Sequence, residues 1–227
     1  MKRSKLTALL AAVMLTGMGP YCANAVLTLP IADDARTEEG TMRLGAGATL
    51  ESDVNLYGGR FTYGIADGIA LFGGGGLVDP DGISSEPFLQ IGGQFSLPID
   101  DLPFDLAVRA AFGIASFDES ETIRERDFTV RSKTELDIWD LNVGLLASSE
   151  LDAVTLYGFV GISYQKVDFK VTNRMNGFRE SFSDDDTDTE LAIGGGLLFP
   201  VDDSISLYGE LMHIDELFVS LGGRFEF

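Results

Sequence analysis

The chain has 227 residues, a formal net charge of −20 and 45% hydrophobic residues, with one cysteine and one histidine. A surface this acidic repels nucleic acid and tolerates divalent cations, and the hydrophobic content with 16 Phe residues argues against disorder. Because about 200 residues can form a single domain of almost any class, the fold class must be inferred from the order of residues along the chain.

Residues 1–25 have the pattern of a cleaved signal peptide. A basic start, which includes Lys2 and Arg3, precedes the apolar run Leu6–Met18 and an A-x-A cleavage motif that ends at Ala25. A membrane anchor needs roughly 20 apolar residues, and this run is shorter. We therefore expect an exported chain that begins near Val26 and contains no cysteine, because Cys22 leaves with the signal peptide.

Residues 26–40 show no sustained hydrophobic period, and they contain Pro30 and several acidic residues. We expect them to form a short periplasmic segment ahead of the folded domain, which would then comprise residues 41–227.

From residue 41 onward, apolar residues recur at every second position between turn residues, which is the pattern of half-buried strands. The run Gly73–Gly76 lacks the following helix of a phosphate-binding loop, so we expect crowded strand positions there. The predicted strands are residues 41–50, 54–65, 69–78, 87–97, 104–117, 134–147, 154–171, 189–200, 204–213 and 217–227.

The predicted connections alternate in length. They are short after strands two, four, six and eight, whereas residues 79–86, 118–133 and 172–188 form longer polar connections after strands three, five and seven. Short periplasmic turns that alternate with longer outer loops are typical of transmembrane β-barrels. Because the connections after strands one and nine are also short, a barrel of eight strands remains an alternative to one of ten.

The last strand, residues 217–227, reads LFVSLGGRFEF and ends on Phe225 and Phe227. It resembles the closing strand of outer-membrane β-barrels, and the chain from residue 41 is similar in pattern to the small OmpA/OmpX-type barrels. The resemblance implies an all-β, closed antiparallel transmembrane β-barrel in the outer membrane of a Gram-negative envelope. It also implies that Phe225 and Phe227 signal to the barrel-insertion machinery, and that periplasmic chaperones, outer-membrane lipid and lipopolysaccharide are partners.

Charged residues recur on the face opposite to the apolar one, so we expect them inside the barrel. An unpaired buried charge costs several kcal/mol, and side chains just fill the lumen of a small barrel. We therefore predict a paired network that closes the lumen, with a thin polar diffusion channel as the alternative. The predicted lumen residues are Arg43, Arg60, Asp105, Arg109, Asp140, Glu210 and Arg224.

His213 is the single histidine and lies near an outer strand end beside acidic residues. A lipid or peptide hydrolase active at the outer rim would need such a residue, but the parity of His213 matches that of the apolar residues on its strand, which favours a structural or surface-interaction protein over an enzyme. A secreted soluble β-sandwich is a further alternative. No cofactor is expected.

Two polar stretches suggest contacts outside the membrane. Residues 181–190 contain Asp184, Asp186, Asp188 and Glu190 at alternate positions, and such oxygens suit Ca²⁺ or Mg²⁺, although a hydrated acidic loop is the simpler interpretation. Alternation persists within residues 118–133, so this connection could project as a hairpin suited to β-strand addition. Basic residues in both stretches could meet lipopolysaccharide phosphates.

Overall fold

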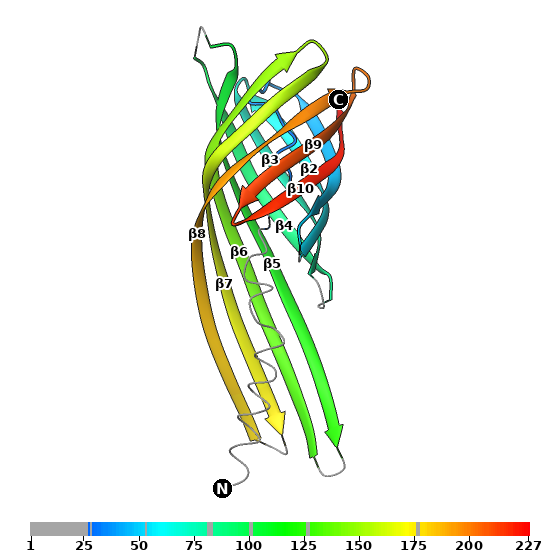
Figure 1. Ribbon diagram of the computed structural model, residues 1–227, viewed down its shortest axis with the longest axis vertical. Coiled ribbons are helices and arrows are strands. Elements are labelled where there is room, and N and C mark those ends of the chain that lie inside the picture. The colour runs from blue at the N-terminus through cyan, green and yellow to red at the C-terminus, as the bar shows by residue number, and fades with distance from the viewer. Residues whose placement is uncertain are drawn as a thin grey trace.

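The computed structural model describes residues 27, 29–52, 54–80, 84–99, 102–125, 128–175 and 178–227. The signal peptide and the predicted cleavage site lie outside these residues. Ten β-strands form one sheet that closes on itself (Figure 1). They are β1 (Met42–Leu50), β2 (Val54–Ala66), β3 (Ile69–Pro80), β4 (Glu86–Leu97), β5 (Asp105–Glu125), β6 (Phe128–Leu151), β7 (Val154–Met175), β8 (Phe178–Pro200), β9 (Ile205–Ile214) and β10 (Glu216–Glu226).

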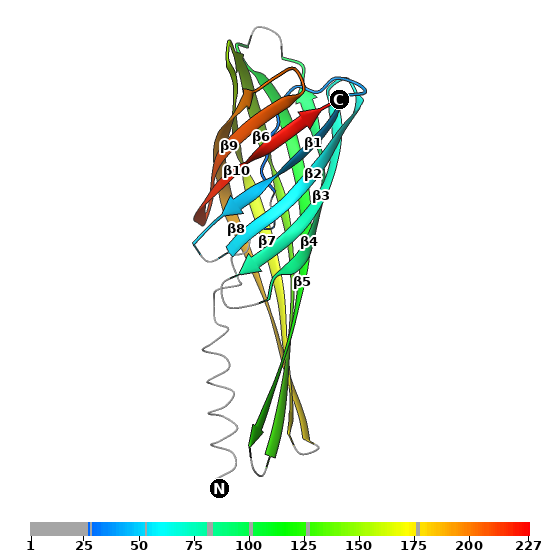
Figure 2. The ribbon, with the colours of Figure 1, turned by 90° about the vertical axis from the view of Figure 1, so that its right-hand side faces the viewer.

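Each strand pairs antiparallel with its sequence neighbours, and the first strand pairs with the last. Along that seam Leu44 lies opposite Phe225 and Ala48 lies opposite Leu221, and Figure 2 shows β1 beside β10. The prediction of a closed ten-stranded barrel is therefore confirmed, and both the eight-stranded count and the two-layered sandwich are excluded. Among the described residues, no helix is long and apolar enough to cross a membrane.

The alternation in the sequence becomes two faces of the barrel wall. On β4, Leu89 and Ile91 are exposed on the outside, whereas Gln90 and Gln94 are buried on the inside. Strand β7 has apolar residues on both faces and follows the same rule, because Leu156 points outward and Tyr157 and Phe159 fill the lumen. An apolar outer face is what lipid tails require, and a polar inner face is typical of these barrels.

Strands β5 to β8 are 21 to 24 residues long, about twice the length of the others. In Figure 1 they run far past the ends of the remaining strands, on the side away from the C-terminus. The predicted loops 118–133 and 172–188 therefore belong to two strand hairpins, in which Glu125 pairs with Phe128 and Met175 pairs with Phe178. Polar composition suggested loops, but both faces of a strand beyond the membrane can be polar because both contact water.

Candidate functional site

The segment of residues 29–39, called here the lumen segment, runs through the inside of the barrel and leaves it at its last residues, where Glu38 and Glu39 are exposed. Leu27 is 0% exposed, and Leu29, Ile31 and Ala35 are also buried. The expectation of a separate periplasmic segment is therefore corrected: the described residues from Leu27 onward lie within the lumen, and they reach the end of the barrel that carries the short turns near Gly40, just before β1. Its alternate apolar residues would otherwise face water, and burial in the lumen removes that cost.

Glycines in the wall make room for the lumen segment. A Cβ at Gly58 would lie 2.9 Å from Leu29 Cδ2, and one at Gly74 would lie 2.8 Å from Leu29 Cδ1. Both glycines point inward on neighbouring strands. The four glycines at residues 73–76 therefore include crowded wall positions, as expected. At Gly74 the crowding comes from the backbone oxygen of Gly59, at 2.5 Å, and from Leu29.

Side chains of the wall hold the backbone of the lumen segment. The Gln94 Nε2 donates to Asp34 O at 2.8 Å, and Ser96 Oγ donates to Ala35 O at 2.5 Å. In return, Ala35 N donates to Ser148 Oγ at 2.8 Å. These bonds satisfy backbone groups that would be unpaired inside the barrel.

Glu210 on β9 is the acidic anchor of the lumen segment. Its Oε2 accepts hydrogen bonds from Ile31 N at 2.9 Å and Ala32 N at 3.3 Å, and from the Tyr157 hydroxyl at 2.8 Å. The Ala32 φ of 40° lies in the left-handed region, which a residue with a Cβ rarely adopts. The bend at Ala32 places Asp33 toward β1 and β2.

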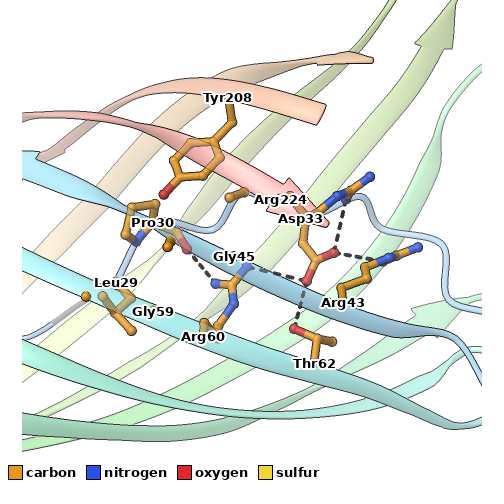
Figure 3. Close-up of a pocket in the computed structure, with 13 residues that line it drawn as sticks. Leu29, Pro30, Asp33, Arg43, Gly45, Gly59, Arg60, Thr62, Tyr208 and Arg224 are labelled. Carbon is orange, nitrogen blue, oxygen red and sulfur yellow. Dashed lines mark hydrogen bonds and ion pairs between the residues drawn. The ribbon is translucent and has the colours of Figure 1, made fainter. Parts of the chain in front are cut away.

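Three arginines surround the carboxylate of Asp33, as Figure 3 shows. The Asp33 Oδ1 lies 2.7 Å from Arg43 Nη1 and 3.5 Å from Arg224 Nη1, and its Oδ2 lies 3.4 Å from Arg60 Nη2. Thr62 Oγ1 donates to the same Oδ2 at 3.4 Å. Asp33 itself is 2% exposed. This arginine cluster, Arg43, Arg60 and Arg224, is the densest charged group of the described lumen.

The remaining predicted lumen residues form separate contacts. Arg109 is buried, donates to Gln94 Oε1 at 3.2 Å and packs over the Phe72 ring at 4.1 Å. Asp140 is 0% exposed and accepts a hydrogen bond from Asn142 Nδ2 at 2.8 Å. The predicted network of wall residues alone is thus corrected, because Asp33 and Asp34 of the lumen segment supply counter-charges beside Glu226 on β10.

Asp105 is a second correction among the lumen residues. It has inward parity, yet it is exposed, because it is the first residue of β5 and lies where the barrel end opens to water. Asp33 and Asp34 were the acidic residues that the sequence interpretation missed. The signal that could have identified them was the alternation of Leu27, Leu29 and Ile31 immediately before them.

Little empty space remains around the lumen segment. One cavity of about 20 Å³ borders the arginine cluster and Tyr208, and another of about 20 Å³ borders Gln90, Arg109 and Phe159. Each volume holds about one water molecule.

The four long strands form an outer sheet, defined here as residues 116–125, 128–137, 168–175 and 178–191. Its edges have no strand partner among the described residues, because β4 pairs with β5 as far as Ala115 and β9 pairs with β8 as far as Ala192. Unpaired edges present free N–H and C=O groups that can accept a further strand.

Ion pairs cross the outward face of the outer sheet. Lys133 Nζ lies 2.6 Å from Glu135 Oε1, and Lys170 Nζ lies 2.9 Å from Glu135 Oε2. These hydrogen bonds, first from Lys133 and then from Lys170, lower the pKa of Glu135 to about 2. Next to the outer sheet, Lys166 Nζ lies 2.9 Å from Asp168 Oδ1.

The acidic residues of 181–190 lie on β8 and not in a loop. Asp184, Asp186, Asp188 and Glu190 are all exposed and spaced along one face of the strand. Among the described residues, no group of three or more His, Cys, Asp or Glu side chains converges as metal ligands. Residues at alternate strand positions lie nearly 7 Å apart, which spreads the carboxylates along the edge.

His213 lies on the outer face of β9, where its Nδ1 is 3.2 Å from Glu216 O. This contact is with the backbone of the β9–β10 turn, so the structure places the ring away from the lumen. At the other end of the barrel, Phe225 and Phe227 are exposed on the outer face, and their ring centroids are 5.4 Å apart.

The comparison with protein-family models agrees with this architecture. The model of the outer membrane protein beta-barrel domain matches residues 23–220, which is most of the chain. Among curated protein sequences, none matches significantly.

Solved structures show the same kind of fold. The outer membrane protease OmpT of Escherichia coli aligns with 88% of this chain and 99% of its own, at 10% identity and a TM-score of 0.54. The N-terminal barrel of Pseudomonas aeruginosa OprF aligns with 84% and 100% at 12% identity and a TM-score of 0.40. Ail of Yersinia pestis aligns with 83% and 99% at 17% identity and a TM-score of 0.35. At these identities the likeness concerns the fold.

Proposed function

Because the chain belongs to the outer membrane protein beta-barrel domain family, and is thus an outer-membrane protein, we propose that it is a closed barrel that presents the outer sheet for contact with other molecules. The observation that carries this proposal is the outer sheet itself: a four-stranded ladder that continues past the barrel, with both edges unpaired in the described part of the chain. A barrel that only let solutes cross the membrane would not need four strands about twice as long as its other six.

The occupied lumen supports the closed state. Cavities of about 20 Å³ leave room for single water molecules, not for a solute. We infer that wild-type protein in planar bilayers gives no steady single-channel current. A stable conductance in the wild-type protein would favour the diffusion channel instead.

The charge of the β8 edge indicates the kind of partner. Residues 178–191 carry Glu180, Asp184, Asp185, Asp186, Asp188 and Glu190 against Arg179. These charges oppose pairing with another acidic edge and favour an extended basic segment of another protein, which would add to the edge by β-strand pairing.

A synthetic peptide of alternating Lys and Thr tests this proposal on protein held in lipid nanodiscs. We expect the peptide to bind, and we expect an N-methylated version, which keeps the charge but lacks half of the strand hydrogen bonds, to bind at least about tenfold more weakly. Hydrogen exchange should slow at residues 178–191. Equal binding of both peptides would show that charge attraction alone holds the peptide, and it would contradict strand addition.

The outward apolar face and the lysines above it support lipid contacts. Phe112, Trp139 and Tyr164 form an aromatic group with ring centroids 6.0 and 5.4 Å apart, as at a membrane interface. Lys166 lies opposite Trp139 in the register, so we propose that it meets lipopolysaccharide phosphates. For His213 we infer no role beyond its exposed contact with the Glu216 carbonyl oxygen. The His213→Ala variant should therefore leave barrel assembly and peptide binding unchanged.

A further inference from the structure

The arginine cluster and the lumen segment differ in how they are attached to the barrel. Arg43, Arg60 and Arg224 lie on β1, β2 and β10, and their backbones belong to the continuous ladder of the wall. Arg60 and Arg224 both pair with Gly45, which has no side chain to separate them. The backbones of the three arginines are therefore positioned by the wall, independently of the carboxylate they hold, although the Arg60 guanidinium also donates to the carbonyl oxygens of Pro30 and Ile31.

The lumen segment is attached by weaker means. Among the described residues, 29–36 make no backbone hydrogen bond to a strand, and their backbone groups are held by wall side chains such as Glu210, Gln94 and Ser148. Backbone pairing with the wall begins at Thr37, whose carbonyl accepts a bond from Gly68 N. Residues 29–36 can thus leave the lumen without breaking any strand pairing.

We propose that the arginine cluster is an anion-binding site, that Asp33 occupies it as a tethered ligand, and that withdrawal of the lumen segment lets small anions enter the barrel. With the segment in place, Asp33, Asp34 and Glu226 offset the three arginines. Without it, Glu226 remains near the cluster, and a local excess of positive charge faces the open space. Guanidinium groups bind carboxylates and phosphates through paired hydrogen bonds, so small carboxylates and phosphate are the ligands that the site fits.

This inference concerns the lumen and goes beyond the proposed role of the outer sheet. Its test is a chain that lacks residues 27–35, inserted in planar bilayers across a gradient of KCl. We expect a steady conductance whose reversal potential favours chloride over potassium. Exchange of Arg43, Arg60 and Arg224 for Gln in this shortened chain should remove that preference.

A matched control removes the same number of positive charges outside the lumen. Exchange of Lys133, Lys166 and Lys170 for Gln should leave the reversal potential of the shortened chain unchanged, because these residues lie on the outward face of β6 and β7, away from the lumen. A shortened chain that migrates as a folded barrel yet stays silent, or that prefers potassium, would overturn the proposal.

The tethered-ligand claim has its own measurement. A peptide with the sequence of residues 29–35, LPIADDA, should block the current of the shortened chain. The same peptide with Asp33→Asn should need about tenfold more for an equal block, since it loses charge-assisted hydrogen bonds. Equal block by both peptides would overturn the assignment of Asp33 as the ligand.

A full-length variant covers the case in which the shortened chain does not fold. Asp33→Asn together with Glu210→Gln weakens both anchors while every strand stays complete. We expect intermittent, chloride-preferring openings that the wild-type protein lacks. A folded double variant that remains as silent as the wild type would count against displacement of the segment.

Discussion

At the scale of single residues, Asp33 is the acidic group on which the lumen depends. It is buried against three arginines. Without this carboxylate, Arg60 would lose the one acidic group it contacts among the described residues, and Arg43 and Arg224 would keep only Asp34 and Glu226. Breaking a buried charge pair by removing one partner is strongly destabilising, because the remaining charge stays buried.

We therefore expect Asp33→Asn to lower the free energy of unfolding by about 3 kcal/mol, measured by urea titration in detergent micelles. Asp34→Asn is the matched control. Its contacts with Arg43 and Arg224 are 3.4 and 3.5 Å long, so the expected loss is about 1 kcal/mol. Equal losses at both positions would contradict the role assigned to Asp33.

Glu210 offers a second prediction at this scale, because it accepts three hydrogen bonds at one oxygen. Glu210→Ala should cost about 3 kcal/mol, whereas Tyr157→Phe, which removes one of these bonds, should cost about 1 kcal/mol. Hydrogen exchange at Ile31 and Ala32 should accelerate in Glu210→Ala. Unchanged exchange there would show that Glu210 does not hold the segment.

At the scale of elements, the hairpins β5–β6 and β7–β8 are held together by strand pairing and by exposed ion pairs. Glu135 lies between Lys133 and Lys170 on the outward face. Each exposed ion pair contributes little to the free energy of unfolding. The contact of Lys170 with Glu135 nevertheless joins β7 to β6, so it favours the observed register of these two strands.

The low pKa of Glu135 predicts a pH dependence. Its pKa falls from the usual 4.5 to about 2 in the folded hairpins, so its stabilising effect is fully present above pH 4.5 and is lost as the pH falls through about 2. Carbon-13 NMR of the Glu135 carboxyl group should show a midpoint near 2. In Lys133→Gln with Lys170→Gln the midpoint should return toward 4.5, and a normal midpoint in the wild-type protein would contradict this.

At the scale of the whole molecule, closure of the barrel depends on the pairing of β1 with β10. The exposed rings of Phe225 and Phe227 end that seam, opposite the start of β1. Both rings lie on the outer face, where the insertion machinery could contact them before β1 pairs with β10. Their role as an insertion signal stays a prediction.

We expect Phe225→Ala with Phe227→Ala to reduce the amount of folded barrel in outer membranes severalfold, as judged by heat-modifiable gel mobility. Leu221→Ala removes an equally exposed residue from the middle of β10 and serves as the control. A comparable reduction in the control would point to lost lipid contact rather than to a terminal signal.

The positions of the strands and the direction of their side chains followed from the sequence, because a period of two residues directly assigns each side chain to one face. Thus Arg43, Arg60 and Arg224 could be placed inside, and Phe225 and Phe227 outside, before any coordinates. The same rule was less informative where both faces meet water. Alternation within residues 118–133 still indicated a projecting hairpin, whereas residues 172–188 were taken for a loop although the described part of that range is strand.

The contents of the lumen were decided only by the tertiary structure. The contact of Asp33 with Arg224 joins residues 191 positions apart, and no local pattern encodes a pairing at that separation. Strand periodicity shows which wall residues face inward, but not what fills the space between them. Inside the barrel, the inward arginines need counter-charges and the wall glycines leave space for side chains. Leu27 and the lumen segment supply both the carboxylates and the apolar side chains.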